Sequence, residues 1–137
     1  MCGTPLAFKL LTATPASYRN EAHLADFNQT AIGVNLTCIP ALVGNVVLWK
    51  PSPMATYSNY LTHKILLEAG LPPSVIQFVP GNPPEVVSQA MSHSDFAGLS
   101  FTGSTQVFKD LWAKAATNLN VYKGYPRLVG ETGEWRL

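Results

Sequence analysis

The sequence predicts an α/β fold in which helices cover both faces of a parallel β-sheet. Two observations carry this prediction: short apolar runs alternate with longer helical segments, and each run is continuous rather than alternating in polarity. Continuous apolar strands are typical of parallel sheets, because both faces of such sheets are buried. Strands that are separated by helices indicate repeated strand–helix–strand units.

The first predicted elements are an apolar helix over residues 29–45, interrupted or ended near Pro40, and the strand VVLWK over residues 46–50. Ser52 then fits an N-cap that is followed by proline in the first helical turn. The helix that it begins is predicted to end at Ala69, just before a glycine suited to a C-terminal cap.

One face of this second helix is apolar. Tyr57, Leu61 and Ile65 recur at helical spacing, which is typical of a face that packs against a core. The remaining predicted strands cover residues 75–79, 97–101 and 127–130, and the helices between them cover residues 84–91 and 104–118.

Composition excludes several classes of function. The 137 residues are 47% hydrophobic and 12% charged, with a net charge of +1. Charged residues make up about 25% of an average domain, about twice the share found here. With so few charges, part of the chain's apolar surface is expected to lie against protein outside the sequence. Without a basic run, neither a nucleic acid nor an anionic membrane is an expected partner, and no apolar run is long enough to span a bilayer.

Cysteines and histidines give no sign of a metal site. Cys2 and Cys38 lack the spacing of a metal motif or a disulfide framework. The three histidines have no partner at ligand spacing; they are His23, His63 and His93. We therefore expect no metal and no Ser-His-Asp arrangement.

Polar groups and glycines follow each predicted strand. Ligands of open parallel sheets bind beyond the carboxyl ends of the strands, so these positions are the candidate site. They are Lys50-Pro51-Ser52, Pro80-Gly81-Asn82, Thr102-Gly103-Ser104 and Gly130-Glu131. Taken one at a time, these features have simpler interpretations: Ser104 would only cap a helix, and Lys50 would be a solvated lysine at the end of a strand.

Five motifs give these features a family context. They are FN (27–28), PALVGNVVLWKPS (40–52), EAGLPPSVIQFVPG (68–81), SFTGST (100–105) and GETG (130–133). Their order and spacing resemble the aldehyde dehydrogenase superfamily over about residues 26–133. Phe108 stands where most of that superfamily has glycine. With YPRLVGETG, this residue resembles the branch that oxidises glutamate γ-semialdehyde, in equilibrium with Δ1-pyrroline-5-carboxylate, to glutamate in proline breakdown.

The resemblance implies a fold and a domain organisation. Residues 26–133 would form part of a Rossmann-like NAD-binding domain, and residues 1–25 and 134–137 would be divergent ends. In eukaryotes this branch is mitochondrial, which implies the matrix. The N-terminus carries only Lys9 and Arg19 as cations, too few for a convincing transit peptide, so the cytoplasm remains the alternative.

The resemblance also implies a mechanism for oxidising a small aldehyde. In the family, a cysteine thiolate attacks the aldehyde, hydride passes to NAD, and a glutamate activates the water that hydrolyses the thioester. Asn28 matches the asparagine that holds the oxyanion, and Glu131 matches the general base. The implied cofactor residues are Lys50 on the adenosine ribose, Gly103 and Ser104 on the pyrophosphate, and Ser52 and Gly81 beside them.

The sequence departs from the family pattern in several ways. The family's nucleophilic cysteine lies beyond the glutamate motif and outside these 137 residues, and Cys38 does not match it. Pro53 replaces a usual acid, and the strand expected directly before Asn28 is not recognisable. We therefore expect a fragment that is inactive alone. The alternative is a non-catalytic dinucleotide-binding or interaction module that docks on a full-length homologue.

Overall fold

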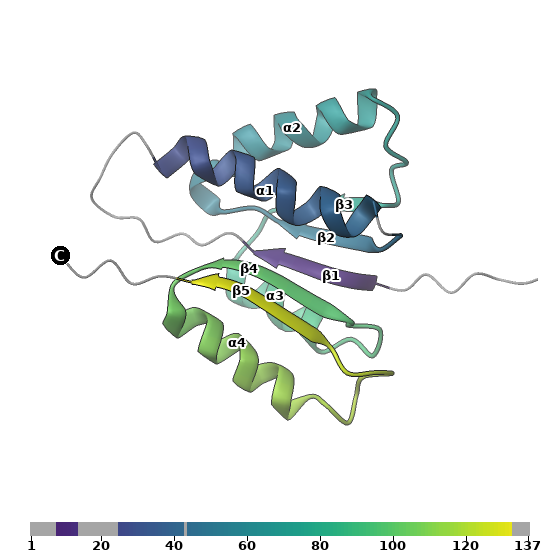
Figure 1. Cartoon of the computed structure of the whole chain (residues 1–137), viewed down its shortest axis with the longest axis vertical. Helices are drawn as coiled ribbons and strands as arrows, with labels where there is room; N and C mark the ends of the chain where they lie inside the picture. The colour runs from purple at the N-terminus through teal and green to yellow at the C-terminus, as the bar shows by residue number, and fades with distance from the viewer. Residues whose placement is uncertain (1–7, 14–24, 43, 133–137) are drawn as a thin grey trace, which may run out of the picture.

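A five-stranded parallel sheet organises the molecule in the computed structural model, which describes residues 8–13, 25–42 and 44–132 (Figure 1). The strand order is β3-β2-β1-β4-β5. The strands are β1 (Phe8–Ala13), β2 (Val46–Lys50), β3 (Ile76–Phe78), β4 (Gly98–Gly103) and β5 (Arg127–Thr132). All four adjacent pairs are parallel, as the continuous apolar runs predicted.

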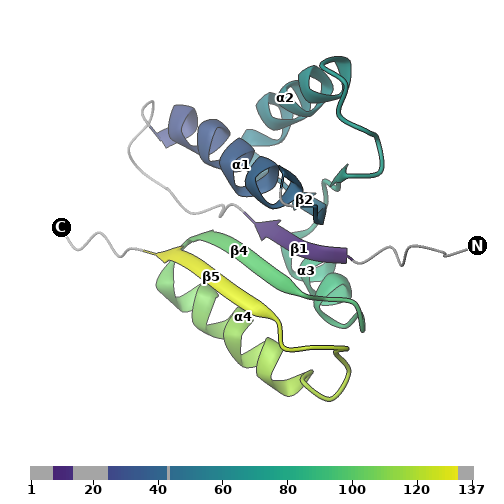
Figure 2. The same cartoon turned by 45° about the vertical axis from the view of Figure 1, so that its right-hand side comes forward.

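Helices cover both faces of the sheet, which confirms the predicted α/β class. α1 and α2 lie on one face, and α3 and α4 lie on the other (Figures 1 and 2). The helices are α1 (Ala25–Leu42), α2 (Thr56–Glu68), α3 (Pro83–Met91) and α4 (Thr105–Thr117), and the 3₁₀ turn η1 (Pro53–Ala55) precedes α2.

The central strand is the element that the sequence analysis did not find. β1 lies within the segment 1–25 that was assigned no element, yet it pairs with both β2 and β4. Leu11 is in register with Leu48 on one side and with Leu99 on the other. A strand does therefore precede α1, although it ends at Ala13, well before Asn28.

Two separate cores result, one on each face of the sheet. Between the sheet and α1 and α2, a cluster forms around Val47, Trp49 and Ile76. Between the sheet and α3 and α4, the larger cluster contains Met91, Leu99, Phe101, Leu111, Ala115 and Tyr122. The Tyr122 hydroxyl donates to the Met91 carbonyl at 2.7 Å, so its polar end is satisfied inside this core.

α1 continues through Pro40, where the sequence predicted an interruption or an end. The proline stands in the last turn, so it removes a single backbone donor from the helix. Its carbonyl accepts from the backbone and side-chain nitrogens of Asn45, at 3.0 and 2.9 Å. Gly44, at φ 85°, gives the chain the left-handed turn that brings Asn45 back to the helix end.

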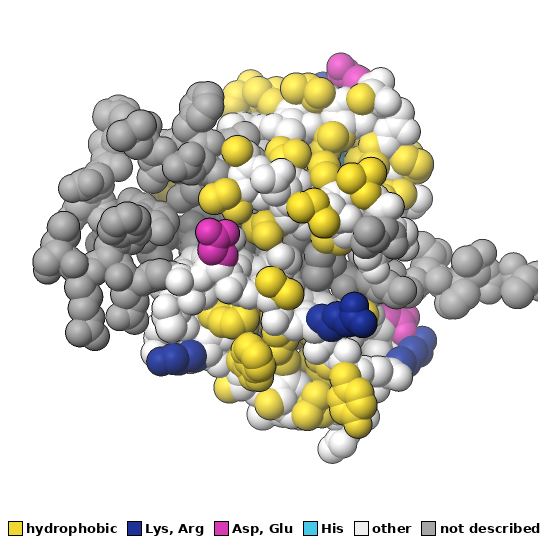
Figure 3. Space-filling model, in the orientation of Figure 1, with side chains coloured by type: hydrophobic (Ala, Val, Ile, Leu, Met, Phe, Trp, Pro, Cys, Tyr) yellow, Lys and Arg dark blue, Asp and Glu magenta, His cyan; other side chains and the backbone are white. Residues whose placement is uncertain are grey.

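The apolar face predicted for α2 does not pack against the core. Tyr57, Leu61 and Ile65 are 75%, 42% and 62% exposed. Figure 3 shows hydrophobic side chains gathered on the upper part of the molecule, where α1 and α2 lie. The α2 side chain that packs against the cluster around Trp49 is Leu66, so the face that meets the core is not the predicted one.

Phe108 and Gly130 form a size-matched contact between α4 and β5. A Cβ built on Gly130 would lie 2.6 Å from Cζ of the Phe108 ring and 2.7 Å from two other ring atoms. The ring itself is fixed, because it stacks on Phe101 and meets Trp112 edge-on. A large residue at 108 therefore requires glycine at 130.

We predict that Gly130→Ala destabilises the fold through this contact. Overpacking a fixed ring costs about 1–3 kcal/mol, which chemical denaturation would measure. Gly124→Ala is the matched control, because a Cβ there meets nothing within 4 Å. Phe108→Leu should recover much of the loss when combined with Gly130→Ala. Equal stability of the two alanine variants would contradict the packing argument.

Candidate cofactor-binding site

The carboxyl ends of the strands meet at one edge of the sheet, around the end of β1. Ala13 is in register with Lys50 of β2 on one side and with Phe101 of β4 on the other. The chain leaves β1 toward β2 and β3, and then crosses back to place β4 on the opposite side of β1. In open α/β sheets, such a reversal of strand order marks the place at the carboxyl ends where ligands bind.

Lys50 ends β2 as a buried cation. Its side chain is 1% exposed, and its Nζ donates to the Pro51 carbonyl at 2.5 Å. Burial lowers the pKa of this amine from 10.5 to about 8, because the charged form loses its hydration. No carboxylate of the described residues forms an ion pair with it. An ammonium has three donors, and this one donates to a single carbonyl among residues 8–13, 25–42 and 44–132, so it is suited to a ligand that brings oxygen atoms.

The end of β4 and the start of α4 form the second part of the site. Gly103 is buried, and the next residue, Ser104, caps α4. The Ser104 hydroxyl accepts from the Val107 N–H at 3.3 Å, which confirms the predicted N-cap. The remaining N–H groups of this first turn favour an anion. Beside them, Oγ1 of Thr102 is buried without a hydrogen-bond partner among the described residues.

Ser52 and Gly81 lie just beyond the ends of β2 and β3. Ser52 is fully buried at the N-cap position of η1, where its carbonyl accepts from Ala55 N and Thr56 Oγ1 at 3.1 and 2.9 Å. Its side chain does not form the predicted cap bond. Gly81 has φ 155°, and a Cβ there would lie 3.1 Å from Cγ2 of Val86, so the turn into α3 favours glycine.

The two residues with implied catalytic roles lie at the same edge. Glu131 is exposed near the end of β5, in register with Thr102. Asn28 lies in the first turn of α1, which begins on the side of the sheet toward which the strands point (Figures 1 and 2). Its side chain lies outside the described part of the structure. Cys38 is near the other end of α1 and packs against the cluster around Trp49.

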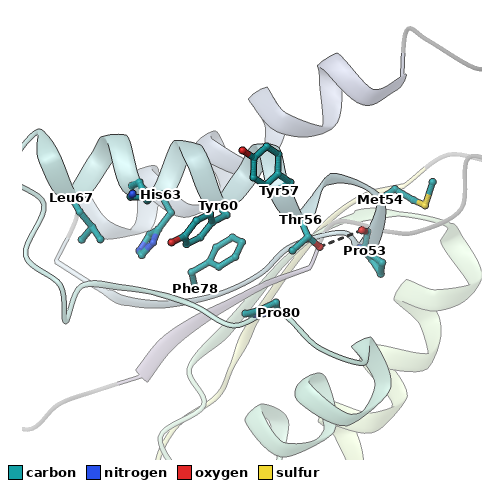
Figure 4. Close-up of a pocket in the computed structure, with 10 residues that line it drawn as sticks. Pro53, Met54, Thr56, Tyr57, Tyr60, His63, Leu67, Phe78 and Pro80 are labelled. Carbon is teal, nitrogen blue, oxygen red and sulfur yellow. Dashed lines mark hydrogen bonds between the residues drawn. The ribbon is translucent and has the colours of Figure 1, made fainter.

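A groove of about 820 Å³, which no sequence motif indicated, lies on the outer side of β3 (Figure 4). It lies between α2 and the edge strand, and its aromatic walls are Tyr57, Tyr60 and Phe78. His63 stacks on Phe78, and its Nε2 lies 3.0 Å from the Ile76 carbonyl. Pro80 is the one candidate-site position that lines this groove, whereas Lys50, Ser52, Gly81, Gly103 and Ser104 do not.

The described residues carry neither a membrane-spanning helix nor a metal cluster. None of their helices has the length and apolar character that crossing a membrane requires. No group of three or more His, Cys, Asp or Glu side chains in that part of the chain could hold a metal ion.

Comparison with known proteins places the whole arrangement in one family. A profile of the aldehyde dehydrogenase family matches residues 22–132. The Delta-1-pyrroline-5-carboxylate dehydrogenase of Agaricus bisporus is 62% identical over 110 residues, or 80% of this chain and 20% of that protein. The mitochondrial enzyme of the same name from Emericella nidulans is 58% identical over 112 residues, with the same shares. This chain thus spans about 20% of the length of these relatives.

Solved structures agree with the sequence comparison. The Delta-pyrroline-5-carboxylate dehydrogenase of Mycobacterium tuberculosis bound with NAD superimposes with a TM-score of 0.81 at 45% identity. The match covers 94% of this chain and 22% of that one. The 1-pyrroline-5-carboxylate dehydrogenase from Thermus with bound NAD matches with a TM-score of 0.76 at 27% identity, over 93% of this chain and 23% of that one.

We predict that the buried Lys50 amine makes stability depend on pH. From pH 8 to 10 the unfolded chain still holds a proton that the folded chain has lost, so stability rises with pH over this interval. Lys50→Met should be more stable at pH 7, by at most about 3 kcal/mol, because one pKa unit corresponds to about 1.4 kcal/mol.

The advantage of Lys50→Met should shrink as the pH rises from 8 to 10. Urea denaturation at several pH values measures it, and Lys64→Met, at an exposed lysine of α2, is the control. A constant difference between wild type and Lys50→Met across this interval would contradict the prediction.

Proposed function

This chain belongs to the aldehyde dehydrogenase family, and we propose that it supplies part of the NAD-binding domain of a Δ1-pyrroline-5-carboxylate dehydrogenase. The enzyme would oxidise glutamate γ-semialdehyde to glutamate in proline degradation. The observation that carries the proposal is the set of donors at the carboxyl edge. Lys50 ends β2 and Ser104 begins α4, on either side of the end of β1, and no carboxylate pairs with Lys50 among the described residues.

The residues at this edge fit a dinucleotide. The Lys50 ammonium would donate to the hydroxyls of the adenosine ribose. Gly103 leaves the start of α4 open, so that its free N–H groups and Ser104 would contact the pyrophosphate. Ser52 and Gly81 would form the walls beside the adenosine. Bound NAD would supply the hydride acceptor of the oxidation.

Glu131 and Asn28 would act on the aldehyde carbon. An amide from Asn28 would stabilise the oxyanion without changing its own protonation. Glu131 would take a proton from the water that releases the acid product, for which its place at the end of β5 gives solvent access. By family resemblance, the nucleophilic thiol lies beyond Glu131 and outside residues 1–137.

A second candidate is a non-catalytic module that binds a dinucleotide or docks on a full-length homologue. The exposed apolar face of α2 favours it, because Tyr57 and Ile65 present apolar surface that no described element covers. Protection of the chain by NAD against heat or protease would favour a working cofactor site. Co-purification with a full-length enzyme, without such protection, would favour the docking module.

The relatives also bear on location. Those from Emericella nidulans, Dictyostelium discoideum and Danio rerio are named mitochondrial. We propose the mitochondrial matrix for this protein as well, with the cytoplasm as the alternative. Imaging of a C-terminally tagged protein at native expression would distinguish the two.

We predict that Lys50→Ala and Ser104→Ala each weaken NAD binding. A charge-assisted contact contributes about 1.5–3 kcal/mol, so losing the lysine should raise the Kd about tenfold or more. Calorimetric titration measures the effect, and Lys64→Ala on α2 is the control. Equal affinities in wild type and both site variants would reject the assignment.

We predict that residues 1–137 alone do not oxidise the aldehyde. Hydride transfer requires nucleophilic attack by a positioned thiol, and Cys38 is packed against the Trp49 cluster. No NADH absorbance should appear with glutamate γ-semialdehyde and NAD. Turnover that disappears in Cys38→Ser would show that this cysteine acts as the nucleophile.

A further inference from the structure

β5 has a long unpaired edge. It is the last strand of the sheet, and β4 is its one partner among the described residues. The opposite edge strand, β3, is three residues long and stands between Pro73 and Pro80. Short strands and prolines protect an edge from pairing. β5 has six residues and no proline, so it lacks both protections.

The backbone of β5 presents alternate residues to this edge. The Arg127 N–H donates to the Ala97 carbonyl at 3.1 Å, so Arg127 directs its backbone groups toward β4. Because hydrogen-bonding directions alternate along a strand, Leu128 and Gly130 direct their N–H and C=O groups away from β4. These two residues are therefore available to a further strand.

The side chains of β5 are divided between the two faces. Leu128 packs against the cluster that includes α4, and Gly130 lies against Phe108, so the even positions face α4. Arg127, Val129 and Glu131 lie on the other face and are exposed, Val129 to 64%. A cation, an apolar residue and an anion thus form one row along the free edge.

This row is complementary to itself. When a second copy of β5 runs antiparallel with Val129 opposite Val129, each Arg127 lies opposite a Glu131. Leu128 then lies opposite Gly130, and these residues exchange both backbone hydrogen bonds. Centring the pair on Arg127 or on Glu131 would instead place like charges opposite each other, which is unfavourable. Charge therefore favours the register centred on Val129, the one that places each Arg127 opposite a Glu131.

We propose that β5 is an interface through which two copies of this chain join their sheets into one, by antiparallel pairing centred on Val129. The contact is isologous, because the same residues serve both copies. Two cross-strand ion pairs flank the Val129 pair, and the backbone bonds of Leu128 and Gly130 connect the strands. The proposal does not depend on the function of the carboxyl edge.

Charge reversal tests the pairing. We expect the wild-type chain to form a dimer that dissociates on dilution in sedimentation velocity. Arg127→Glu and Glu131→Arg each place like charges at both pairs and should raise the dimer Kd about tenfold or more. An equimolar mixture of the two variants should recover the dimer, because every pair is then opposite in charge. Lys64→Glu on α2, which changes the net charge as Arg127→Glu does, should have no effect.

A cysteine at the two-fold axis tests the register. Residues opposite each other in a non-hydrogen-bonded antiparallel pair have Cα atoms about 4.5 Å apart, within the range for a disulfide. In a Cys2→Ser background, Val129→Cys should form a cross-linked dimer under mild oxidation. Tyr125→Cys in the same background should form no cross-linked dimer. Position 125 is 93% exposed, but it does not face its own copy in this register.

Four results would overturn the proposal. The first is a wild-type chain that stays monomeric across the concentration range. The second is a dimer that survives both charge reversals, or that the mixed variants fail to recover. The third is a dimer abolished instead by Ile65→Glu, which would assign the contact to the exposed face of α2. The fourth is association with a full-length homologue alone.

Discussion

The pairing of β1 with both of its neighbours is the interaction on which the structure depends. β2 and β3 lie on one side of β1, and β4 and β5 lie on the other. Without β1 the sheet would be two separate pairs of strands, each with its own helices, and paired strands alone have marginal stability. The same strand separates the two halves of the site, since Ala13 is flanked by Lys50 and Phe101. One six-residue strand thus sets both the cohesion of the sheet and the separation of Lys50 from the end of β4.

The site residues are held at a cost to the free energy of folding. Among the described residues, the buried Lys50 amine donates a hydrogen bond to one carbonyl, and the buried Oγ1 of Thr102 has no partner. Buried polar groups without sufficient partners destabilise a fold, whereas a ligand that supplies oxygen atoms removes the penalty. A ligand bound at this site would recover the free energy lost in folding. Polar groups of this kind are therefore expected at a ligand site rather than in a structural core.

Local pattern predicted much of this fold, and non-local pairing accounts for what it missed. The run from Val46 to Lys50 and the cap at Ser104 were correctly located because apolar continuity and capping chemistry are properties of neighbouring residues. β1 was missed because the apolar pair Leu10-Leu11 is flanked by Lys9 and Thr12, so the segment lacks the continuous apolar run of the other strands. It becomes a strand by pairing with β2 and β4. The same limit explains α2, since periodicity identifies an apolar face but not what covers it. The carboxyl-end rule located Lys50 and Ser104, whereas the unpaired Thr102 hydroxyl depends on packing that sequence does not show.

β5 connects the proposed catalytic edge with the proposed interface. Glu131 lies at the carboxyl end of the sheet and also in the exposed row with Arg127 and Val129. As a base, its carboxylate must be free to accept a proton from water. In the proposed pair, the same carboxylate would be held by the Arg127 guanidinium of a second copy. The two proposed roles of Glu131 would therefore compete for one carboxylate: pairing through β5 would engage the group that the proposed reaction needs free.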